Sequence, residues 1–196
     1  MDGYLILGWG SLIWDLDDLA PHVEGAWAMG AGPRLPMEFS RISAKRKGSL
    51  VVCLDPKDGV KCPTHAIRSR RGGLAAAVED LARRERAPAK MIGGVCLATG
   101  TAQGRPKIVG AVRAWCRKTG AAGAVWTDLR PNFAEERGMP FQIAAGVAHM
   151  RALTGESFEE GVRYIASAPA ETDTPLRRAL GAEAWWQQAV AARGLG

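Results

Sequence analysis

A short apolar run near the N-terminus, ended by two glycines, constrains the fold more than any other feature of the chain. Tyr4 to Leu7 are all apolar or aromatic, and Gly8 and Gly10 follow directly. An apolar run of this length that ends at glycines is typical of a buried β-strand followed by a tight turn. Glycines also let backbone N–H groups face a ligand without interference from a side chain. A strand and turn without a ligand explains the same pattern.

Several kinds of site are disfavoured by the residues around this turn. The segment lacks the G-x-G-x-x-G fingerprint of a dinucleotide site, because position 13 is Ile and no helix pattern opens there. Ser11 lies outside a G-x-S-x-G nucleophile elbow. The three histidines do not have the spacing of metal ligands. We therefore expect neither a cofactor nor a bound metal.

Hydrophobic periodicity along the rest of the chain predicts an α+β protein. Further strands are predicted at residues 37–42, 49–54, 92–98 and 124–126, the first of them half-buried. The turn at residues 55–59 predicts a hairpin. Helices are predicted at residues 74–86, 108–118, 142–153, 157–165 and 182–193, with Ser157 as an N-cap. The expected architecture is a small mixed β-barrel or strongly curved sheet with helices packed outside, as one domain over residues 1–196.

Composition and cysteine usage favour a cytoplasmic globular protein. Apolar residues make up 47% of the 196 residues and charged residues 23%, so the chain can bury a core without a disulfide or metal. The four cysteines are far apart and form no C-x-x-C pair, which predicts buried free thiols. No apolar run approaches the roughly 20 residues that span a bilayer, and the first residues do not resemble a signal peptide. We expect no membrane partner.

The net charge of +6 raises the question of a nucleic-acid partner. Some of the 26 basic residues fall into three small groups, within residues 41–47, 68–71 and 83–86. No aromatic residues interleave with them, as a platform for single-stranded nucleic acid requires. This pattern favours solvated basic faces over a nucleic-acid interface.

Four segments resemble the γ-glutamylcyclotransferase-like superfamily. Gly10-Ser11-Leu12 after an apolar strand, followed by Ile13-Trp14-Asp15, resembles the Tyr-Gly-Ser-Leu signature and is closest to the bacterial ChaC-like branch. The other segments resemble uncharacterised bacterial members of the superfamily, and they are Leu35 to Ser43, Val125 to Leu129 and Asp173 to Arg178.

The resemblance implies a reaction and a set of site residues. Family enzymes cyclise a γ-glutamyl amide to 5-oxoproline and release an amine, with one glutamate as acid and base. Leu81 to Arg86 is similar to the family segment that carries this glutamate, so the resemblance assigns the role to Glu85, with Glu79 and then Glu38 as alternatives. The implied residues that bind the γ-glutamyl substrate are Gly8, Trp9, Gly10, Ser11, Leu12 and Arg41.

Two differences from the family leave a second function open. Trp9 replaces the tyrosine of the signature, and Arg86 replaces the small residue that often follows the glutamate. The alternative is a non-catalytic small-molecule or RNA-binding, regulatory protein on the same fold. The sequence does not define the amine that is released, the pathway or the oligomeric state.

Overall fold

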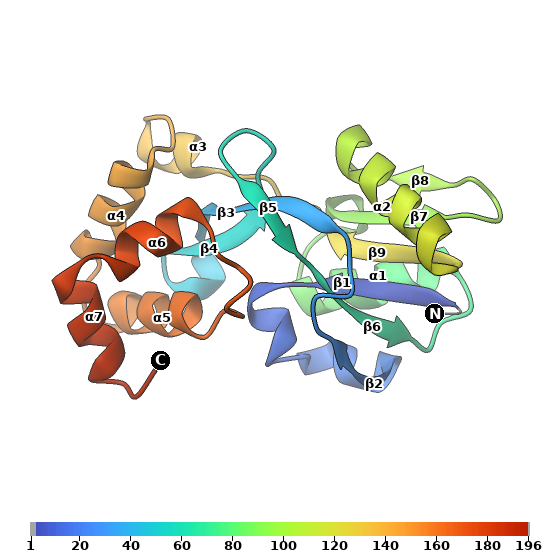
Figure 1. Cartoon of the computed structure of the whole chain (residues 1–196), viewed down its shortest axis with the longest axis horizontal. Coiled ribbons are helices and arrows are strands. Elements are labelled where there is room, and N and C mark those ends of the chain that lie inside the picture. Colours follow the sequence, from blue (N-terminus) through green and yellow to red (C-terminus); the bar gives the residue numbers. More distant parts are fainter. Residues whose placement is uncertain (1–2, 196) are drawn as a thin grey trace. The chain divides into compact units, whose positions relative to one another are not determined.

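The computed structural model describes residues 3–195, and contacts within the chain divide them into two compact units (Figure 1). The N-terminal unit contains residues 3–35 and 63–129, and the C-terminal unit contains residues 36–62 and 130–195. Each unit is assembled from two separate stretches of the chain. A single domain over residues 1–196 stays a prediction.

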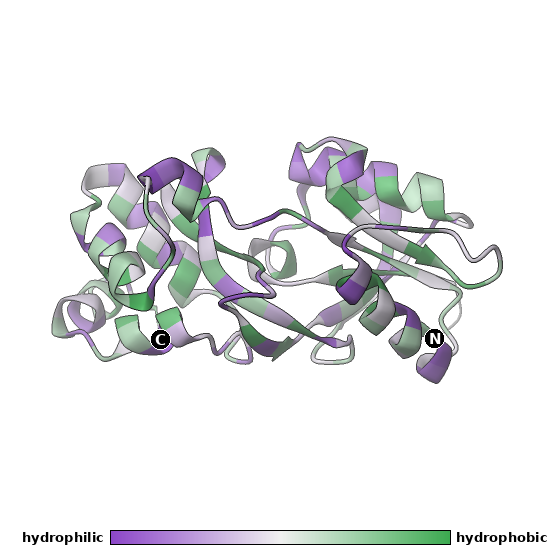
Figure 2. Cartoon of the chain, turned by 90° about the horizontal axis from the view of Figure 1, so that it is seen from above, coloured by the Kyte–Doolittle hydropathy of each residue, from purple (hydrophilic) through white to green (hydrophobic). Residues whose placement is uncertain are grey.

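The N-terminal unit is built on a six-stranded mixed sheet. Its strands lie in the order β2-β6-β1-β9-β7-β8, and only β1 and β9 run parallel. The strands are β1 (Tyr4–Gly8), β2 (Val23–Ala28), β6 (His65–Ser69), β7 (Ile92–Cys96), β8 (Ala102–Gln103) and β9 (Gly123–Thr127). Helices α1 (Leu74–Glu85) and α2 (Pro106–Thr119) cover opposite faces of this sheet (Figures 1 and 2). Short 3-10 turns connect these elements at Gly10–Ile13, Asp17–His22 and Ala89–Met91.

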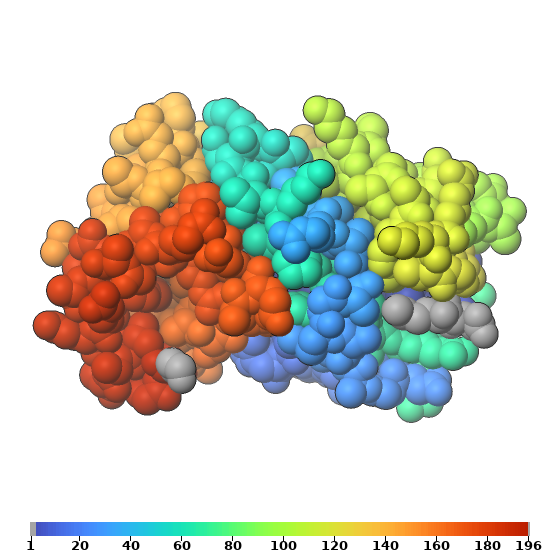
Figure 3. Space-filling model, in the orientation of Figure 1, coloured from blue at the N-terminus to red at the C-terminus, as the bar shows by residue number. Residues whose placement is uncertain are grey.

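The C-terminal unit combines a three-stranded sheet with a group of helices. The sheet has the order β4-β3-β5, formed by β3 (Arg34–Ser43), β4 (Ser49–Leu54) and β5 (Val60–Pro63), with a 3-10 turn at Ala44–Arg46. The helices are α3 (Phe133–Arg137), α4 (Ile143–Ala152), α5 (Gly155–Ala166), α6 (Pro175–Gly181) and α7 (Ala184–Ala191). Figure 3 shows the last of these helices, in orange to red, as one continuous surface.

The α+β class expected from the sequence is confirmed, but the barrel is not. Each sheet ends in unpaired edge strands, and no strand pairing among residues 3–195 closes either sheet on itself. The predicted strand at residues 49–54 is confirmed, and so is the helix that begins at Leu74. The helix predicted at residues 182–193 is shorter and is preceded by the separate helix α6.

Three local predictions in the C-terminal unit are wrong for reasons that the structure makes clear. The turn at residues 55–59 does not join paired strands, because β5 lies beside β3 and not beside β4. Strand β3 is not half-buried, since its polar residues Glu38 and Ser40 are fully buried. Ser157 is not an N-cap, because α5 begins at Gly155 and the Ser157 hydroxyl donates to the carbonyl of Lys47.

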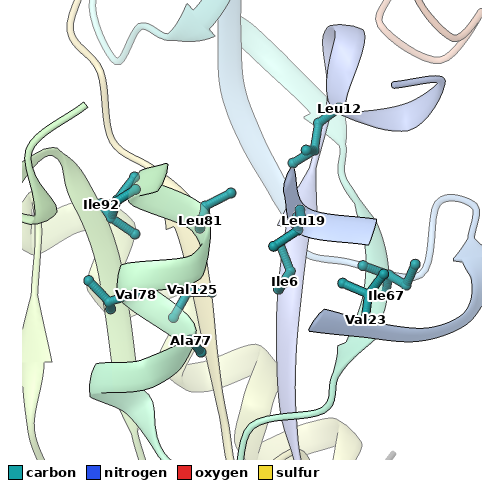
Figure 4. Close-up of a cluster of buried hydrophobic side chains, with 11 residues drawn as sticks. Ile6, Leu12, Leu19, Val23, Ile67, Ala77, Val78, Leu81, Ile92 and Val125 are labelled. Carbon is teal, nitrogen blue, oxygen red and sulfur yellow. The ribbon is translucent and has the colours of Figure 1, made fainter. Parts of the chain in front are cut away.

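The core of the N-terminal unit lies between α1 and its sheet (Figure 4). Ala77, Val78 and Leu81 of α1 pack against Ile6 of β1 and Val125 of β9. Their spacing along the sequence is helical, which is why the sequence predicted both the helix and its buried face. The same core includes Leu12, so the glycine turn is anchored where α1 is anchored.

Two further observations concern the thiols and the membrane. All four cysteines are free and buried, as the sequence predicts. In the part of the chain that the structure describes, no helix has the length and apolarity that crossing a bilayer would take.

Candidate functional site

The turn after β1 is a tight 3-10 turn, Gly10–Ile13, and its first residue needs a left-handed backbone. Gly10 has φ of +56°, a conformation that glycine adopts far more readily than other residues. The Ser11 carbonyl accepts hydrogen bonds from the N–H groups of Trp14 (3.3 Å) and Asp15 (2.9 Å). The sequence reading of a strand that ends in a glycine turn is therefore confirmed.

The side chains of the turn are divided between the core and the surface. Trp9 and Leu12 are buried, and Ser11 is half-buried. Gly8 lies under the ring of Trp27, because a Cβ atom at position 8 would come within 2.4 Å of that ring. The ring of Trp27 therefore explains why position 8 is glycine. The turn that follows remains the candidate segment for contacts with a ligand.

A buried arginine connects this turn to the C-terminal end of α1. The side chain of Arg84 is 1% exposed, and its guanidinium donates from Nε (3.2 Å) and Nη2 (2.5 Å) to the carbonyl of Asp15. The Asp15 carboxylate lies 3.6 Å from the same guanidinium. A charge that is nearly completely removed from water must have such partners. Arg84 therefore holds the end of the glycine turn against the last turn of α1.

Glu85 follows Arg84 and lies at the same end of the helix. Its side chain is 21% exposed, and Oε1 lies 3.9 Å from Nη1 of Arg84. Arg84 consequently has two carboxylates and one carbonyl around it, from the turn and from α1. The structure thus brings the segment of Glu85 and the glycine turn together in one unit.

The residue after Glu85 has a conformation that favours glycine. Arg86 caps α1 with φ of +51°, and its N–H is bonded to carbonyls of the last helical turn. A left-handed cap is the position where helices most often use glycine. The side chain of Arg86 lies 3.7 Å from Asp17 and is mostly exposed.

The two alternative glutamates lie in different surroundings. Glu79 is exposed on α1 and lines a cavity near the opposite end of the helix. Glu38 is fully buried in the C-terminal unit, where it accepts hydrogen bonds from the N–H groups of Phe39 (2.7 Å) and Leu176 (3.2 Å). Burial raises the pKa of Glu38, although hydrogen bonds from Thr174, Phe39 and Leu176 oppose that effect. Its contacts join β3 to the start of α6, which is a structural role.

Arg41 belongs to the C-terminal unit and so is not in the unit that carries the turn. Its Nη1 donates to the carbonyl of Arg130 (2.6 Å), which ties β3 to the segment after β9. A contact between Arg41 and a substrate stays a prediction.

Arg84 and Asp15 are the residues of this site that the sequence analysis did not identify. Arg84 looks like one more member of the basic group at residues 83–86. Its spacing from Ala77 and Leu81, however, places it on the buried face of α1, and that periodicity was the available signal. Asp15 contributes mainly its backbone carbonyl, which no side-chain pattern reveals.

Many other basic residues are paired with acids within their own unit. Arg71 binds Asp80 through Nε (2.5 Å) and Nη2 (2.9 Å), and Arg105 binds Asp128 (2.8 Å). Arg46 pairs with Glu160, and Lys47 pairs with Glu156. These pairs reduce the free positive charge of the basic groups noted in the sequence.

Comparisons with known proteins do not place the chain in a family. No match was found with models of protein families, with curated proteins or with solved structures. The resemblance described above therefore rests on the quoted segments alone.

Proposed function

We propose that this chain is a γ-glutamylcyclotransferase-type enzyme that releases 5-oxoproline from a γ-glutamyl amide. The observation that carries the proposal is the Arg84 contact, which joins the glycine turn to the helix end that bears Glu85. The resemblance assigns both segments to one active site, and they are neighbours in one compact unit. The released amine is not part of the proposal.

The left-handed conformation of Arg86 supports the same assignment. A small residue or glycine often follows the glutamate in the family pattern, and this chain has arginine there. The backbone at position 86 nevertheless adopts the conformation that a glycine would prefer. The local backbone therefore agrees with the family pattern even though the side chain does not.

The chemistry needs one group that both accepts and returns a proton. The α-amine of the substrate attacks its own γ-carbonyl, and the carboxylate of Glu85 takes the proton that the amine loses. The same carboxylate then protonates the departing nitrogen. Positioned acid–base catalysis of this kind contributes roughly 10²- to 10⁴-fold. Arg84 would act as a positioning residue, because it lies 3.9 Å from the Glu85 carboxylate and donates to the carbonyl at the end of the turn.

The glycine turn would supply the binding contacts. Backbone N–H groups at the start of a turn or short helix have no partner within that turn, so they can donate to an oxyanion or a carboxylate. Ser11 is half-buried and could add its hydroxyl to this set. The substrate must also be held in a folded, ring-like pose, and such positioning supplies several kcal/mol more.

The test is a screen of γ-glutamyl dipeptides, glutathione and γ-glutamylamines for 5-oxoproline release. We expect at least one compound to be turned over by the wild-type protein. The Glu135→Gln variant is the matched control, because Glu135 is an exposed helical glutamate in the other unit. A Glu79→Gln variant that lost activity, with Glu85→Gln active, would move the role to Glu79. No release from any compound would contradict the proposal.

A further inference from the structure

The N-terminal unit contains a cavity of about 500 Å³ away from the glycine turn. It lies between the first half of α1 and the edge of the sheet formed by β7 and β8, and Tyr4 at the start of β1 contributes to its wall. Leu74 and Val78 form an apolar side, whereas Cys96 and Thr99 form a polar side. Its lining shares no residue with the glycine turn, and it does not include Glu85. The proposed function makes no use of it.

Hydrogen-bond donors converge on the sulfur of Cys96 at this cavity. The Tyr4 hydroxyl donates to Cys96 Sγ over 3.1 Å. The hydroxyl and N–H of Thr99 and the N–H of Ala98 also face the sulfur. The Thr99 hydroxyl also donates to the Thr101 hydroxyl over 2.8 Å and accepts from the N–H of Thr101 over 3.3 Å, so its hydrogen is shared between the sulfur and Thr101.

The N-terminus of α1 extends this set of donors. The N–H of Leu74, at the first position of α1, donates to the Tyr4 hydroxyl oxygen. The partial positive charge of the helix start is thus directed through Tyr4 to the sulfur. A neutral thiol is a weak acceptor and gains little from several donors, whereas a thiolate gains much.

The pKa values of Cys96 and Cys116 are shifted in opposite directions. Hydrogen bonds from Thr99 and Tyr4 and from nearby N–H groups lower the pKa of Cys96 to about 7, against the opposing effect of burial. Burial raises the pKa of Cys116, on α2, to about 11. Burial thus dominates at Cys116, whereas the hydrogen-bond donors at the cavity dominate at Cys96.

We propose that this cavity is a second reactive site, in which the thiolate of Cys96 exchanges with small-molecule disulfides. The sulfur attacks one sulfur of R–S–S–R, a new S–S bond forms between Cys96 and one half, and the original S–S bond breaks. The other half leaves as R–S⁻ and takes a proton from water. One disulfide replaces another, so no external oxidant or reductant is needed.

The lining of the cavity indicates which disulfides fit. Its volume of about 500 Å³ leaves room for one small substituent beside Leu74 and Val78. Glu79 is the charged side chain in the lining. The thiolate already balances the partial positive charge at the start of α1. The negative charge of Glu79 should therefore favour a substituent that carries an amine over one that carries a carboxylate.

The experiment treats the folded protein with cystamine or with dithiodiglycolate and follows the mixed disulfide by intact mass and peptide mapping. We expect Cys96 to be modified at least roughly 10-fold faster than Cys53, Cys62 or Cys116. The rate should rise with pH around a midpoint near 7. Cystamine should react faster than dithiodiglycolate. Glu79→Gln should lower the ratio of these two rates by about 2- to 5-fold. An unchanged preference would overturn the assignment of amine-bearing substituents.

Two variants test the donors without relying on turnover. Tyr4→Phe keeps the ring and removes the hydroxyl, and Thr99→Val alters an exposed turn, so the second variant does not disturb the core. Each should move the midpoint of the pH profile upward by at least about half a unit. Cys116→Ser is the matched control and should leave the profile unchanged. Equal modification of all four cysteines, or unmoved profiles in both donor variants, would overturn the proposal.

Discussion

The two ends of α1 hold anionic groups by opposite means. At the N-terminal end, neutral donors and the positive end of the helix dipole face the sulfur of Cys96. At the C-terminal end, the dipole opposes a carboxylate, and the buried cation Arg84 lies beside Glu85. One helix therefore has neutral donors near the sulfur of Cys96 at one end and a buried cation near a carboxylate at the other. The difference predicts that the C-terminal end is the more sensitive to mutation.

The largest effect is expected when the cation at this end is removed. Arg84→Ala leaves a void in the packing and takes the donors from the Asp15 carbonyl, which should lower the free energy of unfolding by about 3 kcal/mol. Urea unfolding measures this loss. Arg83→Ala is the matched control. Arg83 is the exposed neighbour of Arg84, so its replacement should change the free energy of unfolding by no more than about 0.5 kcal/mol. Equal effects of the two variants would show that Arg84 does not connect the turn to α1.

Glu85→Gln should leave the fold intact and affect the reaction. The amide cannot accept the proton of the attacking amine, so kcat/KM for 5-oxoproline release should fall by at least roughly 10²-fold, or about 2.7 kcal/mol. Steady-state assays with the best substrate of the screen measure this change. A variant that stays within a few-fold of the wild type would exclude Glu85 as the acid and base.

Gly10→Val should have a smaller effect, on both stability and binding. A β-branched residue at φ of +56° is strained, which should cost about 1–2 kcal/mol in the free energy of unfolding. Binding of 5-oxoproline, followed by calorimetry, should weaken as well. Gly72→Val serves as the control, since that glycine has open space around it and no left-handed φ. If both variants cost the same, the left-handed conformation of Gly10 carries no special requirement.

Arg86→Gly should act in the opposite direction and weakly. Glycine relieves the left-handed strain at the cap of α1, so thermal unfolding should show a gain of about 0.5–1 kcal/mol. The gain should be partly offset by the loss of the exposed contact with Asp17. A loss of stability would mean that the Arg86 side chain matters more than its backbone strain.

Local patterns predicted most of the secondary structure of the N-terminal unit but not the way its strands pair. The spacing of Ala77, Val78 and Leu81 revealed α1, and the glycines revealed the turn. Its sheet was not predictable in the same way, because β1 pairs with β6 and with β9 through contacts distant in sequence. The buried side chain of Glu38 made β3 look half-exposed, since its partner Leu176 lies far along the chain.

Candidate site residues could be proposed from the sequence only where a motif carries them. Gly10 and Glu85 come from segments with a recognisable pattern. Arg84 could not be distinguished by pattern from the exposed arginines beside it. The proposed role of Cys96 depends on donors from β1 and from the loop before β8, which only the fold brings together. The sequence correctly predicted that Cys96 is buried and free, but it could not predict that the sulfur lines a cavity.

The proposed function requires that the glycine turn and the end of α1 form one ligand site. Amide chemical shifts of the folded protein, recorded during a titration with 5-oxoproline, test this requirement. We expect saturable shifts at Gly10, Ser11 and Glu85 with one common dissociation constant, and no change at Gly146 of the other unit. Shifts at only one of the two segments, or shifts with different dissociation constants, would contradict it.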